Sequence, residues 1–284
     1  MKEIKSLHEA RTIFSTDHKC REYLRKMRWP NGVTCPRCGS KYVTYLEARQ
    51  QWQCKCCYQF SVTAGTIFHK THIDLPRWML AVWSICNSPK GISSKQIERE
   101  LGVTYKTAWY MTRRIRGAIQ NSFLSVVIEG TVEIDEAVIH ADGGKAGGHT
   151  PFNTKDVIGM TSRESGILRL VVLERLWKSE IKRVCMSNLR NVHTVYTDAA
   201  QRLKFLKMYG EHKAIRHYMG YADGTVHVNT IESAWALFKR GLMGIYHHIS
   251  AQHLQEYLDE FVLRFSYRDH KTAMFDRVLS HCAV

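Results

Sequence analysis

Three carboxylates lie where they could hold divalent metal ions. Asp135 interrupts the strand-like run TVEIDEAVI, Asp198 ends the run HTVYTD, and Glu232 opens the helical segment TIESAWALFKR. A carboxylate in or at the end of an apolar strand is costly unless a cation compensates it. Three such groups from two strands and a helix could hold two ions roughly 3.5 to 4 Å apart, the arrangement for attack on a phosphodiester. Lys239, seven residues after Glu232, falls on nearly the same helix face and could meet a DNA phosphate.

Each of these acids also has a purely structural interpretation. Asp198 could be a turn residue, Glu232 could be favoured by the helix dipole, and Asp135 could be a charge on an edge strand. Glu133 and Glu136 flank Asp135 and are expected on the other face of the strand. They are therefore weaker candidates for the metal site.

Five of the nine cysteines cluster near the N-terminus. Cys35 and Cys38 form one CxxC pair, and Cys54 and Cys57 form a second after fifteen intervening residues. The two-residue gap lets a tight turn aim both thiolates at one ion, and four sulfurs complete the tetrahedron that zinc prefers. Four ligands leave no open position, so we expect a structural zinc. Cys56 offers alternative pairs with Cys54 or with Cys57, but neither has the two-residue gap.

The segment 76–119 is typical of a helix-turn-helix. Pro76 suits a first helical turn, Ser93 begins a capping box, and Gly102 would end that second helix. Thr104 would cap a third helix that turns apolar residues inward. The opposite face of this third helix is basic and aromatic and suits the major groove of DNA: Lys106, Tyr110, Arg113 and Arg114. The alternative is a packing unit of three helices whose basic face is only solvated.

The charge of the chain is uneven. Its 284 residues carry 41 Lys and Arg against 26 Asp and Glu, a formal net charge of +15. Residues 1–120 hold 21 of the basic and 8 of the acidic side chains. Such asymmetry is expected of a nucleic-acid-binding region attached to a differently employed body.

Composition and hydropathy exclude two classes of protein. At 44% hydrophobic and 11% aromatic residues, the chain is too apolar to be disordered. No run approaches the roughly 18 apolar residues of a membrane span, so we expect no membrane partner. The first residues lack the apolar stretch of a secretory signal, and we therefore expect a cytoplasmic protein with reduced cysteines.

The order of the elements indicates the fold class. From residue 131 onward, short β-branched runs come first and helical patterns lie between and after them. This order predicts a mixed α/β domain. We expect three domains: a zinc ribbon with a short N-terminal helix over 1–70, a helical DNA-binding domain over 71–125, and the α/β domain over 126–284.

Several motifs, taken in order, closely resemble bacterial and archaeal insertion-sequence transposases of the ISXO type, which join an N-terminal zinc ribbon to a DDE core. These motifs are CPRCG, QCKCCYQFSVTAGTIFH, VEIDEA, TDAA, NTIESAWALFKRG and YHHIS. The resemblance implies an RNase H-like, retroviral integrase-like mixed sheet. It also implies Asp135, Asp198 and Glu232 as the triad that binds two magnesium ions, for which manganese can substitute.

The same resemblance implies partners and an activity. The protein would bind double-stranded DNA at terminal inverted repeats, cleave the 3′ ends and transfer them to target DNA. Bringing two ends together implies at least a dimer, working on the nucleoid. Asn229 lies in a matching motif and could position DNA or metal-bound water. Tyr246, His247 and His248 match a segment of unclear purpose, and residues 140–155 are less basic than in relatives.

Two other functions would fit parts of this sequence. A DNA-binding regulator, or a domesticated remnant, would keep the ribbon and helices around a silent core, and the intact triad argues against it. A nuclease or junction resolvase on the same core would cut DNA without joining ends. Strand-transfer products discriminate the nuclease from the transposase.

Overall fold

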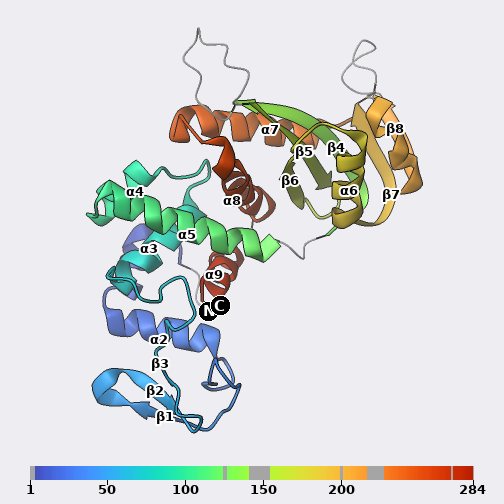
Figure 1. Cartoon of the computed structure of the whole chain (residues 1–284). Helices are drawn as coiled ribbons and strands as arrows, with labels where there is room; N and C mark the ends of the chain where they lie inside the picture. Colours follow the sequence, from blue (N-terminus) through green and yellow to red (C-terminus); the bar gives the residue numbers. More distant parts are fainter. Residues whose placement is uncertain are drawn as a thin grey trace. The chain divides into compact units, whose positions relative to one another are not determined.

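The computed structural model describes residues 4–123, 127–140, 154–198, 201–215, 227–269 and 271–283. The chain divides into two compact units (Figure 1). Unit 1 consists of Met1–Ser88, Ile92–Ser122 and Asp269–Val284, and unit 2 consists of Pro89–Gly91 and Phe123–Arg268. The ribbon and the helical segment thus share one unit, which also takes in the last helix. Three separately folding domains remain a prediction.

The helices of unit 1 begin and end at the residues that the capping signals indicate. Ser93 Oγ accepts a hydrogen bond from Gln96 N over 3.2 Å, and Gly102, at φ +62°, ends the same helix. Thr104 Oγ1 accepts from Thr107 N over 3.3 Å at the start of the next. The helices are α1 (Leu7–Ile13), α2 (Asp17–Arg28), α3 (Leu75–Asn87), α4 (Ser94–Leu101), α5 (Tyr105–Phe123) and α9 (Lys271–Cys282).

Helix α9 completes the core of unit 1 from the far end of the sequence. The ring of Phe275 lies 6.0 Å from that of Phe14 and 6.3 Å from that of Tyr23. Tyr23 Oη donates to Asp276 Oδ1 over 3.2 Å, and Ile67 N donates to Cys282 O over 3.0 Å. The N-terminal helices therefore pack against residues about 250 positions later in the chain.

The ribbon of unit 1 is a small antiparallel sheet. Its strands β1 (Val43–Leu46), β2 (Gln51–Cys54) and β3 (Gln59–Phe60) lie in that order. The rings of Trp29, Trp52 and Phe60 contact one another beside it. So few buried side chains make a thin core, which is typical of a module that needs a metal to be stable.

Unit 2 is built on a five-stranded mixed sheet with the order β6-β5-β4-β7-β8 (Figure 1). β5 is antiparallel to β4 and β6, whereas β7 is parallel to β4 and β8. This order and these directions are those of an RNase H-like core, so the expected fold class is confirmed. The strands are β4 (Ile128–His140), β5 (Thr154–Ser162), β6 (Leu168–Val172), β7 (Leu189–Asp198) and β8 (Glu211–Ile215).

Helices cover both faces of this sheet. α7 (Asn229–Gly241) contacts β4 and β5, and α8 (Leu254–Ser266) contacts β6 on the same face. Helix α6 (Lys178–Asn188) and the 3₁₀ segment η3 (Gln201–Met208) pack on the opposite face. Because side chains alternate along a strand, Val132 and Ile134 of β4 join the α6 core, while Asp135 faces α7.

Two short helical elements connect α7 to α8. They are the π-helix η5 (Leu242–Tyr246) and the 3₁₀ turn η6 (Ala251–His253). None of the helices in the described part of the chain is both long and apolar enough to cross a membrane.

Candidate functional site

Four cysteine thiols of the ribbon converge on one point. The Sγ atoms of Cys35, Cys38, Cys54 and Cys56 all lie within 4.8 Å of one another. Cys35 Sγ is 3.8 Å from Cys56 Sγ, and Cys38 Sγ is 3.7 Å from Cys54 Sγ. Four sulfurs bound tetrahedrally at 2.3 Å from zinc would stand about 3.8 Å apart, so the cluster has the dimensions of a zinc site.

Cys56, and not the expected Cys57, completes this cluster. Cys57 occupies the turn after β2 with φ +63°, and its N–H donates to Cys54 O over 2.9 Å. That conformation leaves Cys57 exposed and outside the thiol group. Spacing alone favours Cys57 because it cannot show which of two adjacent residues takes the turn position.

Hydrogen bonds within the ribbon favour a thiolate at Cys35. Burial opposes ionisation, but the N–H groups of Arg37 and Cys38 and the neighbouring thiols outweigh it and lower the pKa of Cys35 to about 7. Cys56 N donates to Cys54 Sγ over 3.5 Å in the same way, although burial and the thiols of Cys56 and Cys35 outweigh this donor and raise the pKa of Cys54. N–H donors aimed at sulfur stabilise the thiolate, which is the form that binds zinc.

The three proposed catalytic carboxylates come from three elements of unit 2. Asp135 lies within β4, and Asp198 is the last residue of β7. The two strands are parallel and pair Ile134 with Thr197. Asp135 and Asp198 are the next residues along these two adjacent strands. Glu232 lies in the first turn of α7, which contacts β4.

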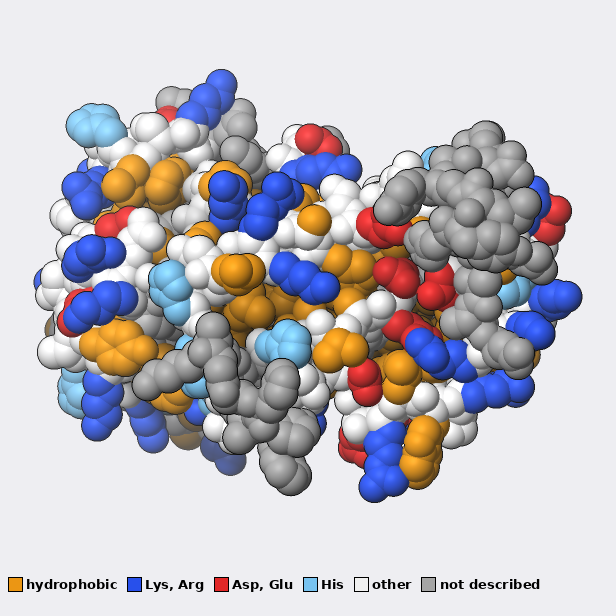
Figure 2. Space-filling view, turned by 90° about the horizontal axis from the view of Figure 1, so that it is seen from above, with side chains coloured by type: hydrophobic (Ala, Val, Ile, Leu, Met, Phe, Trp, Pro, Cys, Tyr) orange, Lys and Arg blue, Asp and Glu red, His pale blue; other side chains and the backbone are white. Residues whose placement is uncertain are grey.

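Asp135 is the most strongly perturbed of these three acids. Burial, with Asp198 and Glu232 adding to it, raises the pKa of Asp135 to about 6, whereas a hydrogen bond from the indole of Trp235 opposes the rise. Asp198 and Glu232 are thus both within electrostatic reach of Asp135. Figure 2 shows acidic side chains gathered on one stretch of the surface.

The three carboxylates are not drawn together as tightly as the thiols. Among the residues that the structure describes, only the cysteine group brings its ligand atoms within 4.8 Å of one another. Like charges without a cation repel, and a site for two ions roughly 3.5 to 4 Å apart needs more room than a site for one.

The structure corrects the expectation for Glu133. It lies on the same face of β4 as Asp135, because two steps along a strand return to the same face. Glu133 is fully buried and contacts the start of α7. Glu136, one step from Asp135, does lie on the other face, where it pairs with Arg202.

The other residues expected near the acids lie on the exposed side of α7. Asn229 is its first residue and is exposed, and Lys239, seven residues after Glu232, is exposed as well. Trp235 was not anticipated as a site residue, although its position three residues after Glu232 places it on a neighbouring part of the helix.

The outer face of α5 carries the expected basic and aromatic side chains. Lys106, Tyr110 and Arg113 are exposed, and Arg114 is half-buried and donates to Tyr110 Oη. Trp109, which the sequence reasoning did not single out, is 37% exposed with the Arg113 guanidinium 5.2 Å from its ring centroid. Ala108, Met111 and Ile115 are buried on the opposite side, as expected.

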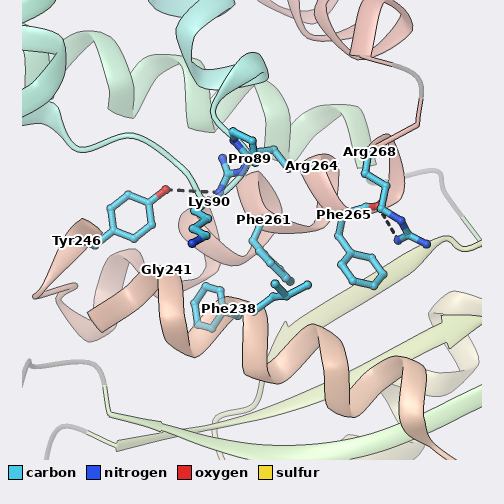
Figure 3. Close-up of a pocket in the computed structure, with 10 residues that line it drawn as sticks. Pro89, Lys90, Phe238, Gly241, Tyr246, Phe261, Arg264, Phe265 and Arg268 are labelled. Atoms are coloured by element: carbon cyan, nitrogen blue, oxygen red, sulfur yellow. Dashed lines mark hydrogen bonds between the residues drawn. The ribbon is translucent and has the colours of Figure 1, made fainter. Parts of the chain in front are cut away.

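Tyr246 contacts side chains of α8. Tyr246 Oη donates to Glu260 Oε1 over 2.8 Å, and Glu260 pairs with the buried Arg264. Tyr246 and Arg264 line a pocket of about 260 Å³ beside the C-terminal half of α7 (Figure 3). The lining includes four aromatic side chains, Phe238, Tyr246, Phe261 and Phe265, and the pocket is distinct from the first turn of α7, where Glu232 lies.

The expectation for residues 140–155 concerns positions that fall mostly outside the described residues, which end at 140 and resume at 154.

Two protein families match this chain, one in the ribbon and one in the region of the five-stranded sheet. A family described as a transposase zinc-ribbon domain matches residues 15–59, and one described as an ISXO2-like transposase domain matches residues 127–266. The first match and the four-thiol cluster together support a structural zinc.

Individual proteins are similar as well. An uncharacterized protein in transposable element ISH50 of Halobacterium salinarum is 28% identical over 275 residues, which cover 88% of this chain and 91% of that protein. A chain in a crystal structure of a pre-cleavage Mos1 transpososome is 11% identical, with a TM-score of 0.31 over 99% of both chains. From the two family matches, the chain belongs to the insertion-sequence transposases that carry a transposase zinc ribbon and an ISXO2-like transposase domain.

Proposed function

We propose that this transposase binds the terminal inverted repeats of its element, cleaves the 3′ ends and joins them to target DNA. The observation that carries the proposal is the placement of Asp135, Asp198 and Glu232 on two adjacent parallel strands and the first turn of one helix.

The donor set fits divalent cations. Three carboxylates offer only oxygen ligands, which magnesium prefers, and manganese accepts the same ligands. Burial and two acidic neighbours raise the pKa of Asp135, which means that its ionised form is unfavourable in the metal-free site. A bound cation would offset this by stabilising the carboxylate. Two magnesium ions held by Asp135, Asp198 and Glu232 would supply activation of the attacking oxygen and stabilisation of the leaving oxygen.

The protein's own side chains would orient this chemistry. Trp235 Nε1 donates to Oδ2 of Asp135 and thereby orients this carboxylate for a cation. Lys239 is exposed on the same helix as Glu232 and could neutralise a DNA phosphate. Asn229, exposed at the start of α7, could hold DNA or a water molecule there. The attacking group would be water in the first step and the freed 3′ hydroxyl in the second.

DNA recognition would belong to unit 1. The outer face of α5, with exposed Lys106, Tyr110 and Arg113 and half-buried Arg114, suits a helix that enters the major groove. The zinc held by Cys35, Cys38, Cys54 and Cys56 would be structural because four thiolates leave no open position. Holding two element ends at once would need at least two copies of the chain, assembled on the DNA of the nucleoid.

An in vitro reaction on the native locus tests the proposal. Its DNA should include the flanking sequence, and the reaction should contain magnesium and either the wild-type protein or Asp135→Asn. New 3′ ends at the borders of an inverted repeat, and their joining to target DNA, are expected only with wild type. Cleavage without joining would indicate a nuclease, and binding without cleavage a regulator or remnant. Equal cleavage by Asp135→Asn would refute the site.

A further inference from the structure

Glu133 is a buried acid for which the proposed chemistry has no use. It lies on β4 two residues before Asp135, with a fully buried side chain. A buried carboxylate needs strong partners to offset the loss of water. The partners of Glu133 therefore indicate what it does.

Those partners are the start of α7, one arginine and the imidazole of His227, whose Nδ1 lies 3.5 Å from Glu133 Oε1. Glu133 Oε2 accepts from the backbone N–H groups of Thr230 and Ile231, over 2.9 and 3.1 Å. Glu133 Oε1 accepts from Thr230 Oγ1 over 3.1 Å and from Arg163 Nε over 2.8 Å. Arg163 also donates to the carbonyl of His227, just before the helix.

Helix α7 has no capping side chain of its own. The residue at its N-cap is Val228, which makes no side-chain cap hydrogen bond. The first N–H groups of a helix need acceptors, and an anion there is favoured by the helix dipole. Glu133 supplies this acceptor from the neighbouring strand β4. The second of the two amides that it binds, that of Ile231, directly precedes Glu232 in α7.

Two further contacts hold the same helix against the sheet. Trp235 Nε1 donates to Asp135 Oδ2 over 3.2 Å. Gly159, which pairs with Asp135 across β4 and β5, leaves room for α7. A Cβ atom at Gly159 would come within 2.6 Å of Trp235 Cζ2 and 2.7 Å of Ile231 Cδ1.

We infer that Glu133 is a positioning residue that sets where Glu232 stands relative to Asp135. Glu133 links β4, which carries Asp135, to the first turn of α7, which carries Glu232. One side chain therefore fixes the positions of both acids relative to each other. This inference rests on the proposed function. It predicts that removing the Glu133 charge loosens the first turn of α7 and weakens metal binding.

Two measurements on the full chain test this role. The first is amide hydrogen exchange of Thr230 and Ile231 in the absence of divalent metal. The second is manganese binding followed by electron paramagnetic resonance, with the binding that Asp135→Asn abolishes taken as the site. The variants are Glu133→Gln and, as a matched control on the opposite face of β4, Ile134→Val.

Glu133→Gln should speed exchange of both amides at least about tenfold and weaken manganese binding about 10- to 100-fold. Ile134→Val should change neither value for this site. Faster exchange with unchanged manganese affinity would overturn the inference, since Glu133 would then only cap the helix. Unchanged exchange would overturn it as well.

The outcome also separates this inference from the proposed function. If wild type has no manganese binding that depends on Asp135, both fail. If wild type binds manganese and Glu133→Gln binds it equally well, only the role of Glu133 fails. If Glu133→Gln does not fold, Glu133→Asp keeps the charge on a shorter side chain and must show both changes in smaller measure. Wild-type values in folded Glu133→Asp would overturn the inference.

Discussion

The indole Nε1 of Trp235 lies 3.2 Å from Oδ2 of Asp135 and donates a hydrogen bond to it. Helix α7 thus contributes one candidate metal ligand, Glu232. About one turn later it contributes Trp235, the hydrogen-bond donor that orients a second candidate ligand, Asp135. Burial and two neighbouring acids raise the pKa of Asp135 to about 6 in spite of that bond.

Trp235→Phe keeps an aromatic ring but removes the donor. The pKa of Asp135 in the metal-free protein should then rise further, because the carboxylate loses a hydrogen bond that favours its charged form. Titration of the Asp135 carboxyl carbon by NMR measures this. Trp177→Phe, at an exposed tryptophan of the same unit, is the control, and an unchanged titration in Trp235→Phe would contradict the expectation.

Asp198→Asn should lower the rate of cleavage about 1,000-fold or more, because metal-dependent stabilisation of the transition state is worth several kcal/mol. Binding of the element ends should stay within about twofold of wild type, since the variant leaves the proposed DNA-binding face intact. Single-turnover cleavage and a gel-shift titration check the two halves. Glu211→Gln, which alters an exposed acid paired with Lys213, should cleave normally.

Cys56→Ser should lose zinc, whereas Cys57→Ser should keep it. The reason is that Cys56 belongs to the four-thiol cluster and Cys57 lies outside it. Elemental analysis of each purified variant gives the zinc content per chain. The opposite result, zinc kept without Cys56 and lost without Cys57, would restore the assignment that the CxxC spacing favours.

Arg113→Ala should weaken DNA binding about 5- to 100-fold, equivalent to roughly 1 to 3 kcal/mol. If Arg113 contacts a phosphate, the loss should be equal on repeat and scrambled DNA, with the salt dependence reduced by about one ion. Fluorescence anisotropy at several salt concentrations measures both. Lys178→Ala, an exposed cation on α6, is the control, and equal losses in both variants would indicate only a change in net charge.

Asp259 of α8 provides a test of stability against pH. Burial raises its pKa from 3.8 to about 6, and Arg169 and a hydrogen bond with Gln255 only partly oppose the rise. The folded state therefore binds more protons than the unfolded state between these values, so the Asp259 contribution to stability falls as pH rises from about 4 to 6.

Asp259→Asn should accordingly be stabilising at pH 7, by up to about 3 kcal/mol, and nearly neutral at pH 4. Urea unfolding of wild type and variant at both pH values checks this. The quantity to compare is the free energy of unfolding from the transition of unit 2. A difference between the two proteins that is the same at both pH values would show that the Asp259 charge is not the cause.

Local signals in the sequence predicted local structure well. Ser93, Gly102 and Pro76 mark helix ends that the structure confirms, because a cap or a terminator acts on its own turn. Asp135 and Asp198 stand in strands where the apolar runs placed them. The pairing of those two strands follows from the RNase H-like topology that the family resemblance implied.

What the sequence could not show depends on choices between neighbours or on contacts across the fold. Cys56 and Cys57 are adjacent, and only the turn after β2 decides which thiol joins the cluster. Glu133 was misplaced by one face of its strand, although its two-residue offset from Asp135 was a readable signal. Its partner, the uncapped start of α7, lies about 100 residues later, beyond the reach of any local pattern.

Helix α9 has a consequence for synthesis of the chain. A ribosome makes the cysteine ribbon and the α5 helix first, yet Phe14, Tyr23 and Ile67 also contact residues 275–282, which are made much later. The core of unit 1 therefore closes after all of unit 2 has been translated. A message cut short anywhere in unit 2 would yield a fragment in which unit 1 lacks α9. On the proposed function, a shortened copy of the element is therefore a poor source of a free competitor for its ends.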